Sequence, residues 1–192
     1  MLSIERHGVP TPSPPRFPVA AKGFRPFFLL AAVFTVVAVP AWLLLWTLTP
    51  ESIGYFGAHY WHAHEMIFGY TVAVIAGFLL TAVANWTGRE TLVGGPLLAL
   101  CGLWVLGRLA VTFGALLPTG VAAVVDLSFW PVLAFVIARP ILGAKSRRNY
   151  GFPFMLTGLF GANLAMHLDA LGLAPGGAAF GTRLGVNLVV LI

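Results

Sequence analysis

Long apolar runs separated by short polar segments dominate the pattern of this chain. No Asp, Glu, Lys or Arg occurs in 26–50, 66–88 or 149–168. A helix needs about 20 apolar residues to cross about 30 Å of hydrocarbon. Each of these runs is long enough, so each predicts a membrane-spanning helix.

Shorter apolar runs surround Arg108, Asp126 and Arg183, and we interpret them as spans interrupted by one ionisable residue. Only helices and closed barrels satisfy the backbone in lipid, and these runs lack the alternation of barrel strands. The predicted fold class is therefore an all-α, polytopic transmembrane helical bundle of about six spans. The expected helices are 26–49, 60–86, 94–113, 119–140, 151–173 and one from 178 onward.

The composition supports the same interpretation. Hydrophobic residues make up 59% of the 192 residues and charged residues only 9%, against about 25% in soluble domains. This excludes a soluble enzyme and a nucleic-acid-binding domain, because the basic residues behind the net charge of +5 lie mostly between apolar runs. One cysteine, Cys101, excludes an intramolecular disulfide and a CxxC metal motif.

The two ends of the sequence lead to different predictions: a tail at the N-terminus and an incomplete bundle at the C-terminus. Residues 10–18 contain five prolines, which excludes a helical signal-peptide start, so 1–21 is expected to be a disordered or surface-lying tail. The transmembrane helical domain is expected over 22–192. Its last run ends in apolar residues without a polar flank, so we expect a C-terminal half with further membrane helices to follow.

Loop charges predict the orientation of the bundle. Basic residues precede the first span and recur in the loops 87–93 and 139–150, whereas 50–59, 114–118 and 174–177 contain none. Cytoplasmic loops are enriched in Lys and Arg. The N-terminus is therefore expected in the cytoplasm.

This orientation places the ionisable residues of the spans at one depth. At 1.5 Å of rise per residue, every span after the first carries one in its outer third. Such residues are costly in lipid and usually mark a site inside a bundle. Snorkelling to the headgroups is an alternative for arginine, but it suits the short side chains of His and Asp poorly. The residues are His62, Glu65, Arg108, Asp126, His167 and Arg183.

The second expected helix can be oriented by its small residues. The stripe Gly69–Ala73–Gly77 predicts a packing face. On an ideal α-helix, His62 lies about 20° and Glu65 about 40° from this stripe, so both are expected to point into the bundle. His64 lies about 140° away and is expected to face lipid, a loop or another partner. The alternative is an interfacial belt anchored by neighbouring aromatic residues.

Imidazoles at one depth can bind haem or a metal. His62 and His167 form the best pair of axial haem ligands, and Arg108 and Arg183 can pair with propionates or with Glu65. His59, His64 and Met66 add imidazole and thioether ligands that suit copper. A second glycine stripe, at 177, 181 and 185, predicts a helix-packing face.

Three stretches resemble the NnrS family of bacterial inner-membrane proteins. They are KGFRPFF at 22–28, WHAHEMIFG at 61–69 and GFLLTAVANWTG at 77–88, with Ala84 where the family pattern has Pro. The resemblance implies a polytopic inner-membrane protein that binds haem and copper and acts in the response to nitric oxide. It assigns no ligand residues, so the ligand hypotheses rest on depth alone.

Three functions remain open. The first is a haem- and copper-binding protein of nitric oxide metabolism or tolerance, with nitric oxide as substrate, ligand or regulatory context. The second is a transporter or channel with an outward-facing polar vestibule, and the third is a structural subunit of a respiratory complex. A Soret band separates the first function from the others, whereas substrate uptake without a chromophore favours the second. An enzymatic activity is neither indicated nor excluded.

The loop charges generate a topology prediction. Alkaline phosphatase fused after residue 55 is expected to be active, because that loop lies outside, and inactive when fused after residue 145. Phosphatase activity in whole cells is the measurement. The reverse pattern would overturn the orientation and the depth assignment with it.

Overall fold

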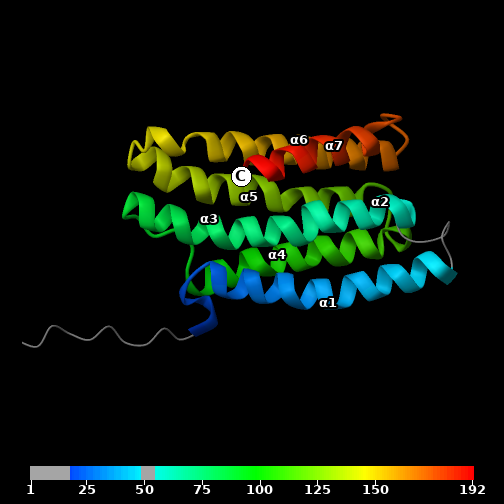
Figure 1. Ribbon diagram of the computed structural model, residues 1–192, viewed down its shortest axis with the longest axis horizontal. Coiled ribbons are helices and arrows are strands. Elements are labelled where there is room, and N and C mark those ends of the chain that lie inside the picture. The colour runs from blue at the N-terminus through cyan, green and yellow to red at the C-terminus, as the bar shows by residue number, and fades with distance from the viewer. Residues whose placement is uncertain (1–17, 49–54) are drawn as a thin grey trace, which may run out of the picture.

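The computed structural model describes residues 18–48 and 55–192, and helices are the only regular elements in that part of the chain. The all-α prediction is confirmed (Figure 1). The long helices are α1 (Phe24–Leu48), α2 (Gly57–His64), α3 (Val72–Thr87), α4 (Gly94–Thr112), α5 (Val121–Gly143), α6 (Gly151–Ala170) and α7 (Gly177–Leu191). Short elements are η1 (Pro18–Ala21), the π-helix η2 (Glu65–Thr71), η3 (Gly114–Leu116) and η4 (Arg147–Asn149).

Four segments of the described chain are long and apolar enough to cross a membrane, so the protein is a helical membrane bundle. One of them, Gly57–Thr87, runs continuously through α2, η2 and α3. The others are Phe24–Leu44, Gly94–Thr112 and Val121–Gly143. Helix α7 is shorter but also apolar. The total of about six spans stays a prediction.

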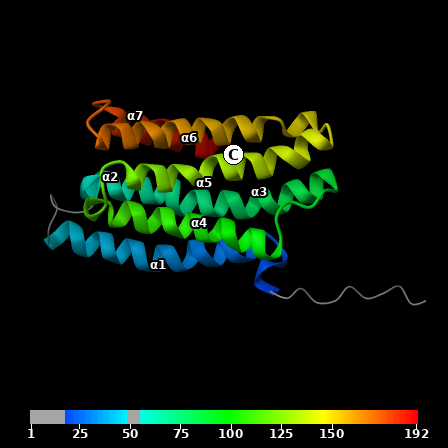
Figure 2. The same cartoon turned by 180° about the vertical axis from the view of Figure 1, so that it is seen from behind.

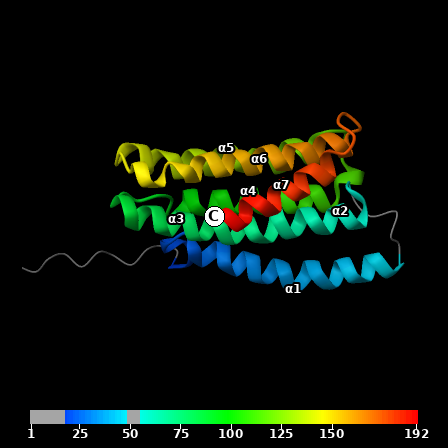
Figure 3. The same cartoon turned by 45° about the horizontal axis from the view of Figure 1, so that its top comes forward.

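The long helices lie side by side along one direction, and α1 occupies one edge of the bundle (Figures 1, 2 and 3). Helices α6 and α7 pack along each other, as do α4 and α5. Large side chains such as Phe27, Leu79, Leu133 and Leu159 are fully buried between the helices. The apolar residues on the free side of α1 remain exposed, as expected for a lipid-facing helix.

The structure describes only part of the boundary between the predicted N-terminal tail and the helical domain. Residues 1–17 of the predicted tail lie outside the described residues, as do residues 50–54 of the predicted outer loop. Residues 18–21 form η1, in which Ala20 is fully buried. The Arg25 guanidinium donates to the Pro18 carbonyl at 2.9 Å, which ties η1 to the start of α1.

The glycine stripe on α7 is a packing face, as the sequence predicts: its first two glycines lie against α6 and the third lies against η2. Gly177, Gly181 and Gly185 are buried. A Cβ added at Gly181 would collide with the Ala162 carbonyl oxygen and lie 2.6 Å from Cγ of Met166. The absence of a side chain therefore lets the two helix backbones approach closely.

We expect Gly181→Ala to lower the melting temperature of the purified protein by several degrees, because overpacking costs about 1–3 kcal/mol. Gly161→Ala is the matched control on α6, since no atom lies within 4 Å of the added Cβ. This control should match or exceed the wild-type melting temperature, because Ala favours a helix over Gly. Equal melting temperatures for both variants would show that the space between α6 and α7 at Gly181 can hold a methyl group.

Candidate functional site

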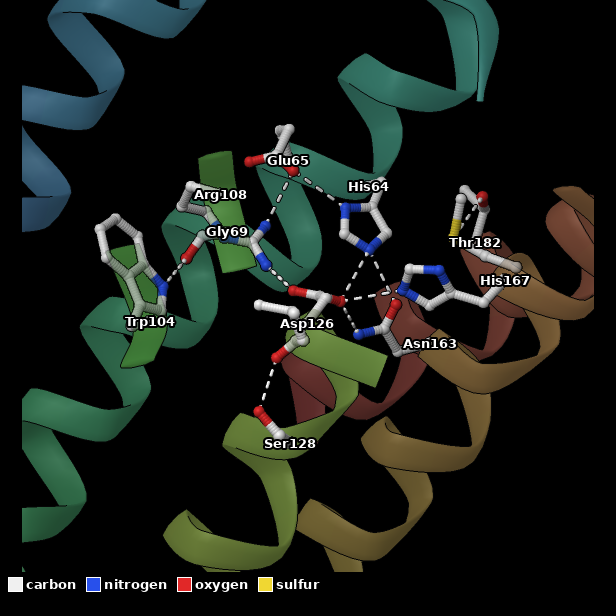
Figure 4. Close-up of polar contacts among 12 residues, drawn as sticks. His64, Glu65, Gly69, Trp104, Arg108, Asp126, Ser128, Asn163, His167 and Thr182 are labelled. Carbon is white, nitrogen blue, oxygen red and sulfur yellow. Dashed lines mark hydrogen bonds and ion pairs between the residues drawn. The ribbon is translucent and has the colours of Figure 1, made fainter. Parts of the chain in front are cut away.

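Polar side chains from five neighbouring elements meet inside the bundle (Figure 4). Helix α2, the π-helix η2, α4 and α5 each contribute one residue, and α6 contributes two. None of the six residues is more than 6% exposed. We call this set the polar cluster; it comprises His64, Glu65, Arg108, Asp126, Asn163 and His167.

The Arg108 guanidinium lies between two carboxylates. Its Nη1 donates to Oε1 of Glu65 at 2.9 Å, and its Nη2 donates to Oδ1 of Asp126. Charge-assisted hydrogen bonds of this kind are among the strongest polar contacts in proteins. The predicted pairing of Glu65 with an arginine inside the bundle is confirmed for Arg108. Arg183, the other candidate partner, is exposed on α7.

Two imidazoles converge on the other side of Asp126. Nε2 of His167 lies 3.0 Å and Nε2 of His64 lies 3.4 Å from Oδ2 of Asp126. The two rings meet edge to face, with centroids 5.5 Å apart. Asn163 completes the contact, because its Nδ2 donates to the same Oδ2 at 2.7 Å and its Oδ1 lies 2.8 Å from Nε2 of His64.

This geometry suits a single metal ion. One ligand atom each from His64, Asp126 and His167 lies within 4.8 Å of the others. Imidazole nitrogen and carboxylate oxygen are common ligands of first-row transition metals. Nδ1 of His64 lies 3.1 Å from Oε1 of Glu65, which is the carboxylate contact that orients many metal-binding histidines.

An aromatic layer covers the imidazoles. Phe56 packs against both rings, with centroids 4.7 Å from His64 and 5.2 Å from His167. The Tyr55 ring centroid lies 5.5 Å from that of His167. Burial, together with the negative charge of Asp126, raises the pKa of the Tyr55 phenol. The phenol is therefore uncharged at neutral pH and adds no charge beside the imidazoles.

The prediction that His64 faces away from the packing stripe is wrong, because His64 is fully buried in the cluster. The cause is the π-helix η2, which follows His64 directly. Five residues turn an α-helix by about 500°, but a π-helix bonds residues five apart and places them on one face. His64 therefore shares the face of Gly69, where an added Cβ would lie 2.8 Å from Oε2 of Glu65.

The same change in register moves His62 away from its predicted partner. The His62 ring stacks on Trp42 of α1, with centroids 3.9 Å apart. The ring neighbours of His167 are instead His64 and the aromatic layer. The structure thus forms a His64–His167 pair in place of the predicted His62–His167 pair. Whether any of these imidazoles binds a metal or haem stays a prediction.

The remaining predicted ligands lie outside the cluster. His59 is exposed on α2, and Met66 is half-buried on η2. Asp126 is the residue whose central position sequence reasoning missed, although its depth matched that of the histidines. Its partners come from three other helices, and no local pattern in the sequence reveals them.

The comparison with protein families identifies relatives for the whole described bundle. The model of the family described as NnrS protein matches residues 18–192, so the chain belongs to the NnrS family. Among curated proteins no match was found, and the same holds for solved structures. The resemblance of the three sequence stretches to this family is therefore confirmed.

We expect Arg108→Met to destabilise the purified protein strongly, because it leaves two carboxylates buried without their cation. Removing one partner of a buried ion pair typically costs about 3–5 kcal/mol. Lys22→Met is the matched control, since Lys22 pairs with Glu90 at 3.0 Å on the exposed surface. Such surface pairs contribute less than about 1 kcal/mol. Similar small changes in melting temperature for both variants would contradict this account of the cluster.

Proposed function

We propose that this NnrS-family protein is a multi-pass protein of the bacterial inner membrane that binds copper in its polar cluster. We further propose that it binds haem and acts in the response to nitric oxide, as the family resemblance implies. The N-terminus is proposed to lie in the cytoplasm. Nitric oxide, or a ligand derived from it, is the proposed small-molecule partner.

The convergence of His64, Asp126 and His167 inside the bundle is the observation that supports copper. Nε2 of each histidine and Oδ2 of Asp126 would bind the ion, and Glu65 would hold the His64 ring in place through Nδ1. Imidazole ligands suit copper, and ionisable groups inside a membrane usually serve a function. A bound copper ion would supply a redox-active centre that can bind a small ligand.

The cluster does not fit haem between its two imidazoles. The Asp126 carboxylate bridges both Nε2 atoms and Asn163 packs beside it, so a flat macrocycle has no space there. The histidines of α2 outside the cluster are the remaining candidates in the described chain. His59 is exposed, and Nδ1 of His62 is buried and makes no hydrogen bond to residues 18–48 or 55–192. We therefore assign haem to this part of α2.

The burial of the cluster also favours binding over transport. A polar vestibule would expose its charged groups to water, whereas the residues here are ion-paired and covered by Tyr55 and Phe56. The same burial suits a bound ion that is held in place by its ligands. The transporter or channel remains the alternative function and predicts substrate uptake by proteoliposomes.

Copper content in single-histidine variants tests the proposal. His64→Ala and His167→Ala are expected to lose most of the copper measured by mass spectrometry in the purified protein, because each removes a ligand. His62→Ala should keep its copper and lose the Soret band, since His62 lies outside the cluster. Full copper content in folded His64→Ala and His167→Ala protein would refute the assignment, as would equal copper loss in His62→Ala.

A further inference from the structure

A pocket of about 420 Å³ lies between α1 and α4. All of its lining residues are hydrophobic except Arg108 and Thr112. Val37 on α1 and Leu109 on α4 are 62% and 50% exposed, so the pocket opens toward the surface that faces lipid. Both helices are membrane-span candidates. A ligand would therefore enter from the hydrocarbon phase.

Two buried donors without partners lie on residues that line this pocket. Nε1 of Trp61 and Nε of Arg108 make no hydrogen bond within the described chain. The two residues are 3% and 6% exposed. A buried donor left unpaired costs about 1–3 kcal/mol, so native proteins rarely leave one without a partner. The pair of donors indicates a hydrogen-bond acceptor in the ligand.

One unpartnered acceptor lies nearby. Oε2 of Glu65 is buried and has no hydrogen-bond partner among the described residues. A Cβ added at Gly69 would lie 2.8 Å from this oxygen and 3.2 Å from Cε1 of Phe34, which lines the pocket. Glu65 itself is fully buried and does not line the pocket. The polar contacts of the ligand therefore rest on the two donors, Nε1 of Trp61 and Nε of Arg108, which need an accepting oxygen atom.

The charges of the cluster exclude an anionic head group. Glu65 and Asp126 already outnumber the Arg108 cation, and a further buried negative charge would lack a partner. An uncharged carbonyl oxygen can use the free donors without this cost. Phe34 and Trp104 meet edge to face in the pocket wall, with centroids 5.5 Å apart, and offer aromatic surface to a flat ring.

We propose that the pocket between α1 and α4 binds a membrane quinone, an uncharged ring with carbonyl groups and a hydrophobic tail. A carbonyl oxygen of the quinone accepts from Nε1 of Trp61 and Nε of Arg108. The tail lies along the apolar side chains of α1 and α4. Arg108 belongs to both the pocket and the polar cluster, but no contact to the quinone involves a residue that we propose as a copper or haem ligand.

A photoreactive azido derivative of decylubiquinone is the probe. The purified protein is placed in phosphatidylcholine nanodiscs, labelled, and displaced with unlabelled decylubiquinone, and the labelled peptides are mapped by mass spectrometry. We expect saturable labelling of α1 and α4. Decylbenzene, which has the tail and ring without oxygen atoms, should displace the probe at least tenfold less well.

Three variants separate the quinone from other occupants. Trp61→Phe keeps the ring and removes one donor, so the affinity for decylubiquinone should fall about tenfold while that for decylbenzene stays constant. Val37→Trp fills the pocket and should abolish labelling. Val124→Trp is the matched control, since Val124 is 70% exposed on α5 and does not line the pocket.

Three outcomes would overturn the proposal of a quinone site. Equal displacement by decylbenzene would show a pocket for acyl chains, which needs no hydrogen-bond donors. Absence of saturable labelling in folded wild-type protein would show that another helix or a second copy fills the space. Unchanged labelling in Val37→Trp would place the quinone elsewhere. If Val37→Trp fails to fold, the Trp61→Phe comparison decides alone. The copper content of Trp61→Phe should stay unchanged, because Trp61 lies outside the polar cluster, and this separates failure of the quinone site from failure of the copper site.

Discussion

The Arg108 guanidinium constrains the interior of this bundle more than any other group. A buried cation is tolerated only with compensating charge, and here two carboxylates from η2 and α5 provide it. Asp126 then carries a second oxygen that Asn163 and the two imidazoles contact from α2 and α6. These contacts hold four helices and the π-helix in one relative position. Removal of any one charged side chain would leave another buried charge without its partner.

The sequence predicted depth much better than direction. Depth follows from the rise per residue, which hardly depends on how regularly a helix winds. Four of the residues expected at one depth do meet in the structure: Glu65, Arg108, Asp126 and His167. Direction accumulates about 100° with every residue, and one irregular turn changes it for everything beyond. The π-helix begins after His62 and includes Gly69, the first residue of the stripe that oriented the helix, so His64 takes the position beside His167 that was expected for His62.

The contrast with α7 supports this explanation. Its glycine stripe lies in an uninterrupted helix, and the sequence identified the packing face correctly. The central position of Asp126 could not be predicted from helix periodicity, for a different reason. Its partners are set by which helices are neighbours, and the loop lengths alone do not determine the order of helices in the bundle. A tertiary arrangement was needed to show that one carboxylate links the cation to both imidazoles.

The π-helix has a further consequence for how the span Gly57–Thr87 tolerates change. The turn before η2 presents its side chains to the cluster, whereas α3 beyond it packs against α1 and α5. The extra residue of the π-turn sets the rotation about the helix axis that relates these two surfaces. Loss of one residue from Glu65–Thr71 would restore an even α-helix and turn His64 by about 100° away from Asp126. The cluster thus depends on chain length within this segment as much as on the identity of the residues that form it.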